Sequence, residues 1–234
     1  HSGHPGSANR GSHFKRRPSV RMGNEGVFPR KHVPTDAILI SHRLTPPRPC
    51  LQRAAMSRDI VYFDLETQRT ANDVGGWDKK RDMGMSLGVT YSTRDGIYEI
   101  FGEDQAEGLV RRLQRADLVV GFNHIRFDYD VLMAYTVLDL RENLLSFDLL
   151  LEIEKAVGHR LKLEDIAQAT LGVGKIADGL DAIKWWREGK ILEIAKYCCF
   201  DVKVTRLVHE YGVKNKEVLY RDRVGRTQRI AVDW

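Results

Sequence analysis

The sequence contains only three cysteines, and no apolar run approaches the roughly 18 residues that a membrane span needs. Two of the cysteines, Cys198 and Cys199, are adjacent, so the set does not suit the disulfide framework of a small secreted protein. They are interpreted as ordinary buried small residues. The basic N-terminal stretch lacks the compact apolar segment of a signal peptide. A reducing, cytoplasmic location without a membrane partner is therefore expected.

Proline is absent after residue 49, because all seven prolines lie before residue 50. Residues 1–55 carry ten Lys or Arg and two Asp or Glu, a net charge of +8, whereas residues 56–234 carry a net charge of −3. Such a segment buries too little apolar surface to offset its ordering entropy, so residues 1–55 are expected to be a disordered tail. It is either a basic arm for nucleic acid or vector-derived or upstream sequence before a start at Met56.

Residues 56–234 predict one α/β domain, with a mixed β-sheet of about five strands flanked by helices. Apolar, β-branched and aromatic runs predict strands at 59–65, 86–92, 96–101 and 117–121. Helical spacing predicts helices at 104–115 with Asp104 as N-cap, at 127–138 and at 191–211, in a mostly helical region from residue 149. A final hairpin is expected at 218–221 and 227–232, with its turn at 224–225.

Acidic residues border apolar segments at three places. Asp64 and Glu66 are two positions apart at the end of the first strand, so both lie on one face. Two such carboxylates repel each other, which a divalent cation relieves, although a satisfied structural pair gives the same pattern. Asp128 opens a helix, where the helix dipole alone favours an acid. Tyr197 and Asp201 are four positions apart and share one face of the long helix.

Together these three places resemble the exonuclease motifs of the DEDD 3′→5′ exonucleases, within the ribonuclease H-like superfamily. The matching segments are Phe63-Asp64-Leu65-Glu66, Asn123-x3-Phe127-Asp128 and Tyr197-x3-Asp201. The tyrosine marks the tyrosine type (DEDDy), because the histidine type would need a histidine at position 196, which is a lysine. The resemblance covers about residues 56–211. It is closest to bacterial predicted exonucleases related to the proofreading domain of family-B DNA polymerases.

The resemblance implies a site for two Mg²⁺ or Mn²⁺ ions, about 3.5–4 Å apart, held by four carboxylates. Asp64 would bridge both ions, and Glu66 and Asp201 would hold the ion that activates the attacking water. Asp128 would serve the second ion through water. Tyr197 would orient the attacking water, and it would not be the base because an unperturbed phenol has a pKa near 10. The product would be a nucleoside 5′-monophosphate.

The substrate is expected to be nucleic acid, with DNA favoured over RNA. A ribonuclease or a structure-selective nuclease with the same site remains an alternative, because no residue is identified as a contact to the 2′-hydroxyl. A second alternative is a non-catalytic module that binds nucleic acid. The presence of all four acids and Tyr197 speaks against such a loss of activity.

Further residues are expected to bind the substrate, namely Asn123, Trp77, Lys79, Lys80 and Arg81. An aromatic ring followed by cations, directly after Glu66, suits a terminal base stacked on the ring and phosphates held by the cations. Alternatively, Trp77 packs onto the domain and the cations are solvated. His124 is weighed as a substrate contact, and Asp148 as a structural acid with a supporting role. Trp185 and Trp186 are expected to pack between helices.

Overall fold

The computed structural model describes residues 58–174 and 176–234. The predicted tail, residues 1–55, lies outside the described residues, so its predicted disorder stays a prediction. Among the residues that are described, no helix is both long and apolar enough to cross a membrane.

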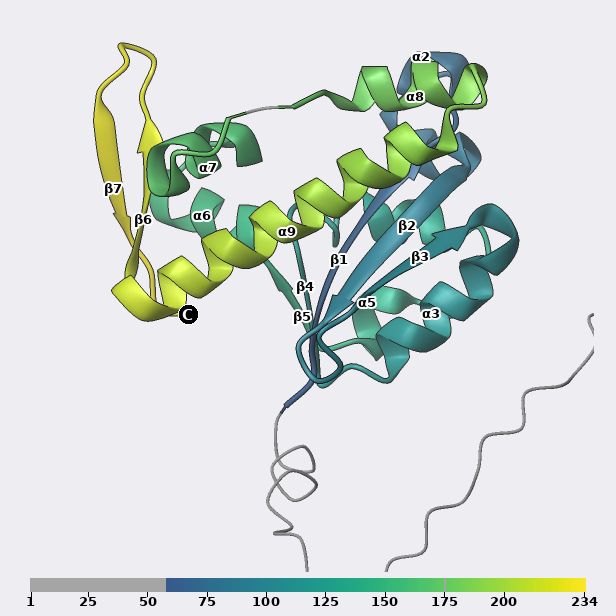
Figure 1. Ribbon diagram of the computed structural model, residues 1–234, viewed down its shortest axis with the longest axis horizontal. Coiled ribbons are helices and arrows are strands. Elements are labelled where there is room, and N and C mark those ends of the chain that lie inside the picture. Colours follow the sequence, from purple (N-terminus) through teal and green to yellow (C-terminus); the bar gives the residue numbers. More distant parts are fainter. Residues whose placement is uncertain (1–57, 175) are drawn as a thin grey trace, which may run out of the picture. The chain divides into compact units, whose positions relative to one another are not determined.

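A mixed sheet of five strands forms the centre of the domain (Figure 1). In spatial order the strands are β3 (Tyr98–Gly102), β2 (Met85–Ser92), β1 (Ile60–Thr67), β4 (Leu118–Gly121) and β5 (Ser146–Asp148). β2 pairs antiparallel with β1 and β3, whereas β4 runs parallel to both β1 and β5. The predicted α/β class and mixed sheet are confirmed.

Helices cover both faces of this sheet (Figure 1). The α-helices are α2 (Ala71–Val74), α3 (Ala106–Gln114), α4 (Asp128–Leu132), α5 (Leu140–Asn143), α6 (Leu149–Val157), α7 (Leu163–Leu171), α8 (Gly179–Arg187) and α9 (Ile191–Asn215). Two 3-10 segments are η1 (Trp77–Met83) and η2 (Glu103–Gln105). One core lies between the sheet and α3, α4 and α5, and the other lies between the sheet and α6 to α9.

β1 contributes to both cores because its side chains alternate between the two faces. Val61, Phe63 and Leu65 enter the core on the side of α3 and α4. The intervening positions face α9, beginning with Tyr62, which is buried in the second core. The acids at positions 64 and 66 share the face of Tyr62, and this fixes on which side of the sheet a carboxylate site can form.

The predicted C-terminal hairpin is confirmed as β6 (Glu217–Arg221) paired antiparallel with β7 (Thr227–Ala231). Its turn contains Gly225, whose positive φ of 79° suits a glycine. The hairpin is attached to α7 through Thr170, whose hydroxyl donates to the carbonyl of Leu219 and accepts from its amide, both at 2.9 Å. This hydroxyl substitutes for a neighbouring strand at the edge of β6.

Two predicted helices begin or end elsewhere. The helix expected from residue 104 starts with η2, and α3 begins at Ala106, so Asp104 is not its N-cap. The helix expected over 127–138 ends at Leu132, because the amides of Ala134 and Tyr135 bond to carbonyls three residues back. The hydroxyl of Tyr135 also accepts from the amide of Met85 at 2.9 Å, which draws this segment toward β2.

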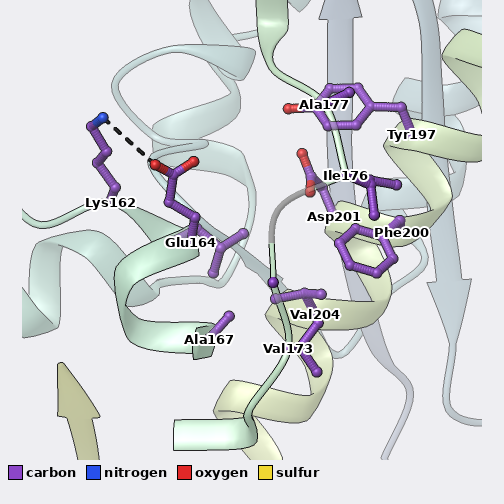
Figure 2. Close-up of a pocket in the computed structure, with 12 residues that line it drawn as sticks. Lys162, Glu164, Ala167, Val173, Ile176, Ala177, Tyr197, Phe200, Asp201 and Val204 are labelled. Atoms are coloured by element: carbon purple, nitrogen blue, oxygen red, sulfur yellow. Dashed lines mark ion pairs between the residues drawn. The ribbon is translucent and has the colours of Figure 1, made fainter. Parts of the chain in front are cut away.

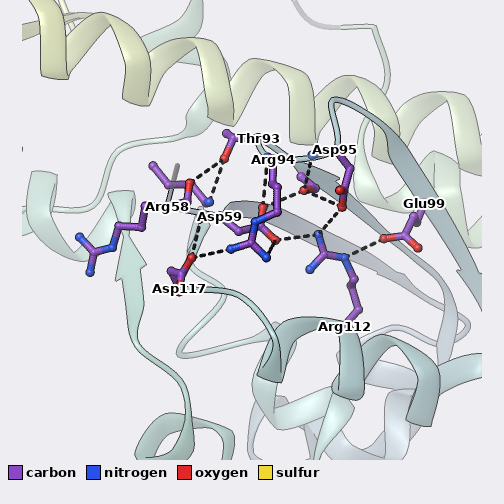
Figure 3. A network of polar contacts seen from close by, with 10 residues as sticks. Arg58, Asp59, Thr93, Arg94, Asp95, Glu99, Arg112 and Asp117 are labelled. Carbon is purple, nitrogen blue, oxygen red and sulfur yellow. Dashed lines mark hydrogen bonds and ion pairs between the residues drawn. The ribbon is translucent and has the colours of Figure 1, made fainter. Parts of the chain in front are cut away.

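A buried ion network holds the beginning of β1 (Figure 3). The carboxylate of Asp59 accepts hydrogen bonds from Ser92 at 2.7 Å and from Arg112 at 3.2 Å, and Arg94 connects it to Asp117. Burial alone would raise the pKa of Asp59, but these hydrogen bonds and the charge of Arg112 keep it below its ordinary value. The network joins β1, β2 and α3 at the end of the sheet opposite to Glu66.

Candidate metal centre and nucleic-acid interface

β1 presents Asp64 and Glu66 on one face, as alternation predicts, and this face is turned toward α9. The thiol of Cys198, on α9, lies 3.5 Å from a carboxylate oxygen of Asp64 and from its carbonyl oxygen. One ligand atom each of Asp64, Glu66 and Cys198 lies within 4.8 Å of the others. The spacing in the sequence and the contact with α9 therefore both indicate one acidic cluster between β1 and α9.

Asp128, the first residue of α4, reaches the same strand from the other side. Its carboxylate accepts a hydrogen bond of 3.1 Å from the amide of Leu65, which lies between the two acids of β1. Asp128 is only 3% exposed. The contact fixes this carboxylate at the level of Asp64 and Glu66.

Tyr197 and Asp201 project from α9 into a pocket of about 130 Å³ (Figure 2). Figure 2 shows the two side chains close together, with the apolar side chains of Ile176 and Phe200 beside them. The ring of Trp185, on α8, packs edge-on against Tyr197 with 6.3 Å between centroids. The predicted packing role of Trp185 is thus confirmed, and it constrains the tyrosine that the sequence singles out.

The acids raise one another's pKa, which shows that they form one electrostatic group. Burial raises the pKa of Asp64 well above its ordinary value, and the charges of Asp128, Glu66 and Asp201 raise it further. Burial and the charges of Asp201 and Asp128 do the same for Glu66. The pKa of Asp128 is raised to about 7, chiefly by burial. Holding these carboxylates ionised together, beside Asp201, needs a compensating positive charge.

For three of the acids, the described residues supply no paired cation. Within residues 58–174 and 176–234, no Lys or Arg forms an ion pair with Asp64, Glu66 or Asp128. Burial and the neighbouring acids raise the pKa of the Cys198 thiol well above its ordinary value, so it stays protonated and donates to Asp64. The donor set is thus made of carboxylate oxygens, which fit a hard divalent cation such as Mg²⁺ or Mn²⁺.

Tyr197 is held as a protonated phenol. Burial raises its pKa above the ordinary value, and the charges of Asp201, Glu66 and Asp64 raise it further, as does its hydrogen bond to Asp201. A phenol in this state can donate a hydrogen bond but cannot accept a proton as a base. This agrees with the expectation that the tyrosine positions a group and does not remove a proton.

Asp148 has a larger role than its sequence context suggests, because it fixes the loop between β4 and α4. Its carboxylate accepts from the amides of Asn123 at 2.7 Å and Ile125 at 3.1 Å, and it caps α6 through the amide of Leu150 at 3.0 Å. Asp148 is 2% exposed and ends β5, the strand that the sequence did not reveal. An acid directly before an apolar helix was the available signal, since it is typical of an N-cap.

Two neighbouring loop residues differ in accessibility. His124 is fully buried, and burial lowers its pKa to about 4, so the weighed role as a substrate contact is contradicted. Its ring instead packs edge-on against Tyr129 at 5.0 Å. Asn123 adopts a positive φ of 68°, which asparagine tolerates better than most residues, and its buried side-chain oxygen Oδ1 has no partner among the described residues.

The segment after Glu66 is more ordered than its polar composition suggests, since it contains α2 and η1. Trp77 is 68% exposed, and its ring stands edge-on to Phe127, the neighbour of Asp128, with 6.3 Å between centroids. It is therefore not a core residue. Lys80 pairs with Asp130 on α4 at 2.9 Å, and so it is not simply solvated.

The other two cations predicted to bind the substrate, Lys79 and Arg81, are both exposed. Lys79 forms no ion pair in the part of the chain that the structure describes, and a guanidinium nitrogen of Arg81 lies 3.8 Å from the sulfur of Met133. Trp77, Lys80 and Arg81 thus contact α4 or the residues directly beside it.

Comparison with known proteins places this chain in a family. No curated protein sequence matches the chain. Among solved structures, 77 chains match, including the family B DNA polymerase from the hyperthermophilic archaeon Pyrobaculum calidifontis. That polymerase matches with a TM-score of 0.52 and 19% sequence identity, over 67% of this chain and 25% of the polymerase chain. The likeness concerns the fold, and this chain spans about a quarter of the polymerase's length.

A family model gives the stronger result. The model of the RNase H superfamily matches residues 61–211, which is more than half of the chain and includes all four acids and Tyr197. The chain belongs to the RNase H superfamily.

Proposed function

We propose that residues 56–234 form a metal-dependent 3′→5′ exonuclease domain of the tyrosine type, which hydrolyses nucleic acid to nucleoside 5′-monophosphates. One observation carries the proposal. Asp64 and Glu66 from β1, Asp128 from α4 and Asp201 from α9 interact electrostatically in one cluster, and Tyr197 hydrogen-bonds to Asp201 beside it. These residues belong to the three motifs that carry the resemblance, and their proximity supports the proposal.

The four carboxylates would hold two divalent cations, which lower the pKa of a bound water and offset the charge of the scissile phosphate. The chain's own groups prepare the site. Asp64 is oriented by the thiol of Cys198, and Asp128 by the amide of Leu65. Tyr197 donates its one hydroxyl proton to Asp201, and its hydroxyl oxygen can accept a hydrogen bond from the attacking water and so restrict its direction of approach.

DNA is the proposed substrate, in preference to RNA. The support is the structural likeness to a protein named as a DNA polymerase, together with the resemblance of the motifs to proofreading exonucleases. Trp77, Lys79, Lys80, Arg81 and Asn123 are proposed to bind the 3′ end. Trp77 is suited to this because it is exposed and adjoins Phe127, next to Asp128.

The test is digestion of 5′-labelled single-stranded DNA, duplex DNA and RNA with Mg²⁺ or Mn²⁺. The wild-type protein should give a descending ladder, strongest on DNA, and both Asp64→Asn and Asp201→Asn should give none while remaining folded. Asp104→Asn is the matched control, since Asp104 is exposed on η2, outside the acidic cluster. Turnover near the wild-type rate in either cluster variant would contradict the assignment.

Calorimetric titration with Mg²⁺ separates the enzyme from a non-catalytic module. The proposal expects binding that Asp64→Asn abolishes. A protein that binds nucleic acid but shows no heat of metal binding would instead support the non-catalytic alternative.

A further inference from the structure

A second candidate site lies in an open groove of about 950 Å³ between the loop at 158–162 and the tip of the β6–β7 hairpin. Its basic residues are Arg160, Lys162, Arg221, Arg223 and Arg226. Only two acids, Asp165 and Asp222, line it. This concentration of positive charge is unusual for the chain, because residues 56–234 as a whole carry a net charge of −3.

Asp222, at the hairpin tip, forms its hydrogen bonds within the hairpin. The carboxylate of Asp222 accepts from the side chains of Arg226 at 3.0 Å and Gln228 at 2.9 Å, and from the amide of Val224 at 3.0 Å. Asp222 therefore shapes the turn and neutralises Arg226. The other three arginines of the groove keep their charge available.

Those three are Arg160, Arg221 and Arg223, and all are exposed. None of them forms an ion pair with a carboxylate anywhere in residues 58–174 or 176–234. Many other exposed cations of the domain are paired, for example Arg111 with Glu107 at 3.2 Å. Three unpaired guanidinium groups in one groove form a surface that a polyanion can occupy without displacing an existing partner.

The walls of the groove are fixed relative to each other. Thr170 joins α7 to β6 through its two hydrogen bonds to Leu219. A second contact also joins the two walls, since the ring of His159 in the loop packs against Tyr220 of β6 with 6.2 Å between centroids. Figure 1 shows the hairpin beside α7 and α6. The backbone that carries the arginines is thus held in place, so less conformational entropy is lost when they bind a polyanion.

The groove adjoins the pocket of the acidic site, because the two share a lining residue. Lys162 lines the groove and also lines the pocket into which Tyr197 and Asp201 project. Figure 2 shows Lys162 on the far side of that pocket from Tyr197. A strand whose end lies at the acidic cluster can therefore pass Lys162 and enter the groove.

We propose that this groove binds the phosphodiester backbone of the substrate strand, several nucleotides away from the bond that is cleaved. The inference deepens the proposed function and rests on it. Arg160, Arg221 and Arg223 would contact phosphates, and such contacts position a strand without reading its sequence. Affinity should therefore rise with strand length until the strand spans both the acidic site and the groove.

The test measures binding without cleavage. The full chain is titrated against 5′-labelled oligothymidylates of 3 and 20 nucleotides in Ca²⁺, and fluorescence anisotropy is followed at several salt concentrations. The groove variant replaces all three of Arg160, Arg221 and Arg223 with Gln. The control variant replaces Arg58, Arg111 and Arg115 with Gln, so it changes the net charge equally. These three arginines are exposed on α3 or directly beside β1 and α3.

Each phosphate contact to a single strand contributes about −0.7 to the slope of log affinity against log salt, so three contacts contribute about −2. Between 50 and 200 mM salt, affinity of the wild type for the 20-mer should fall about 20-fold more than that of the groove variant. The control variant should follow the wild type, and the trimer should bind all three proteins alike. Arg223→Gln alone should lose about a third of the change in salt slope. This single variant keeps the test valid if the triple variant fails to fold.

An unchanged salt slope in the groove variant would overturn the inference, as would an equal loss of slope in the control variant. These outcomes are independent of catalysis. If the wild type fails to hydrolyse DNA but shows the predicted slope, the proposed function fails and the groove stands. If hydrolysis is normal and the groove variant keeps the wild-type slope, the groove alone is refuted.

Discussion

Asp128 provides a test of the acidic cluster that needs no substrate. Its pKa is raised from 3.8 to about 7, chiefly by burial. Because the folded state then holds the proton more tightly than the unfolded chain does, the protein without metal gains stability as the pH falls from 8 toward 5. The shift of about 3 units corresponds to about 4 kcal/mol above pH 8, of which about 2–3 kcal/mol falls between pH 5 and pH 8.

Asp128→Asn removes this proton equilibrium and keeps an oxygen that can accept from the amide of Leu65. The free energy of unfolding is measured by urea denaturation in chelator, at pH 5 and at pH 8. The variant should lose about 2–3 kcal/mol less than the wild type on going from pH 5 to pH 8. Addition of Mg²⁺ at pH 8 should stabilise the wild type more than the variant, because a bound cation favours the ionised carboxylate.

Asp130→Asn is the matched control, two residues further along α4. Burial alone would raise the pKa of Asp130, but its bonds to Lys80 and Arg141 lower it. Its contribution to stability is therefore present above its unfolded pKa and is lost only at lower pH. Between pH 5 and pH 8, this variant should lose as much free energy of unfolding as the wild type does. If Asp128→Asn kept the full pH dependence of the wild type, burial of the Asp128 carboxylate would not be its cause.

Three further substitutions test other parts of the site. Tyr197→Phe should lower turnover about ten- to a hundredfold and leave metal affinity nearly intact, since one positioning hydrogen bond is worth roughly 1–3 kcal/mol; a collapse of metal affinity would show a structural role instead. Trp77→Ala should weaken binding of the DNA 3′ end in Ca²⁺ by about 1–3 kcal/mol and leave denaturant stability nearly unchanged, because the residue is 68% exposed. Unchanged affinity with a stability loss of about 3–5 kcal/mol would refute stacking. Asp148→Ala should cost about 3–5 kcal/mol of stability, because it leaves buried amides unpaired. Asp139→Ala, which removes an exposed N-cap, should cost only about 1 kcal/mol, and equal costs would contradict the role given to Asp148.

The parts of the fold that sequence reasoning predicted are those with a strong local pattern. β1 and α9 have long apolar periodicities, so the faces of Asp64 and Asp201 followed from spacing alone. β5 has only three residues, Ser146–Asp148, which is too short for alternation to identify it. Its last residue, Asp148, stands out in the sequence as an acid next to apolar residues, but its hydrogen bonds to the loop at 123–125 depend on tertiary pairing.

The remaining differences also have tertiary causes. Apolar residues continue past Leu132 and favour a longer α4, yet Tyr135 bonds to the amide of Met85 and ends it. Cys198 was interpreted as an ordinary buried residue. It is buried, and its contact with Asp64 could have been expected, because position 198 is three before Asp201 on one helix. The groove beside the hairpin joins segments about 60 residues apart in sequence, and no local pattern indicates it.

The assembly of the acidic cluster from β1 and α9 also has a consequence for the order of events during synthesis. Asp64 and Cys198 are in contact although they are 134 residues apart in the sequence. At about 5–20 residues per second, a ribosome needs roughly 7–27 s to add the second after the first. During this time the nascent chain contains Asp64, Glu66 and Asp128 but not the helix α9 that carries Asp201. Such distant pairing closes late in folding, so the full set of metal ligands exists only once α9 has been made and has docked on the sheet.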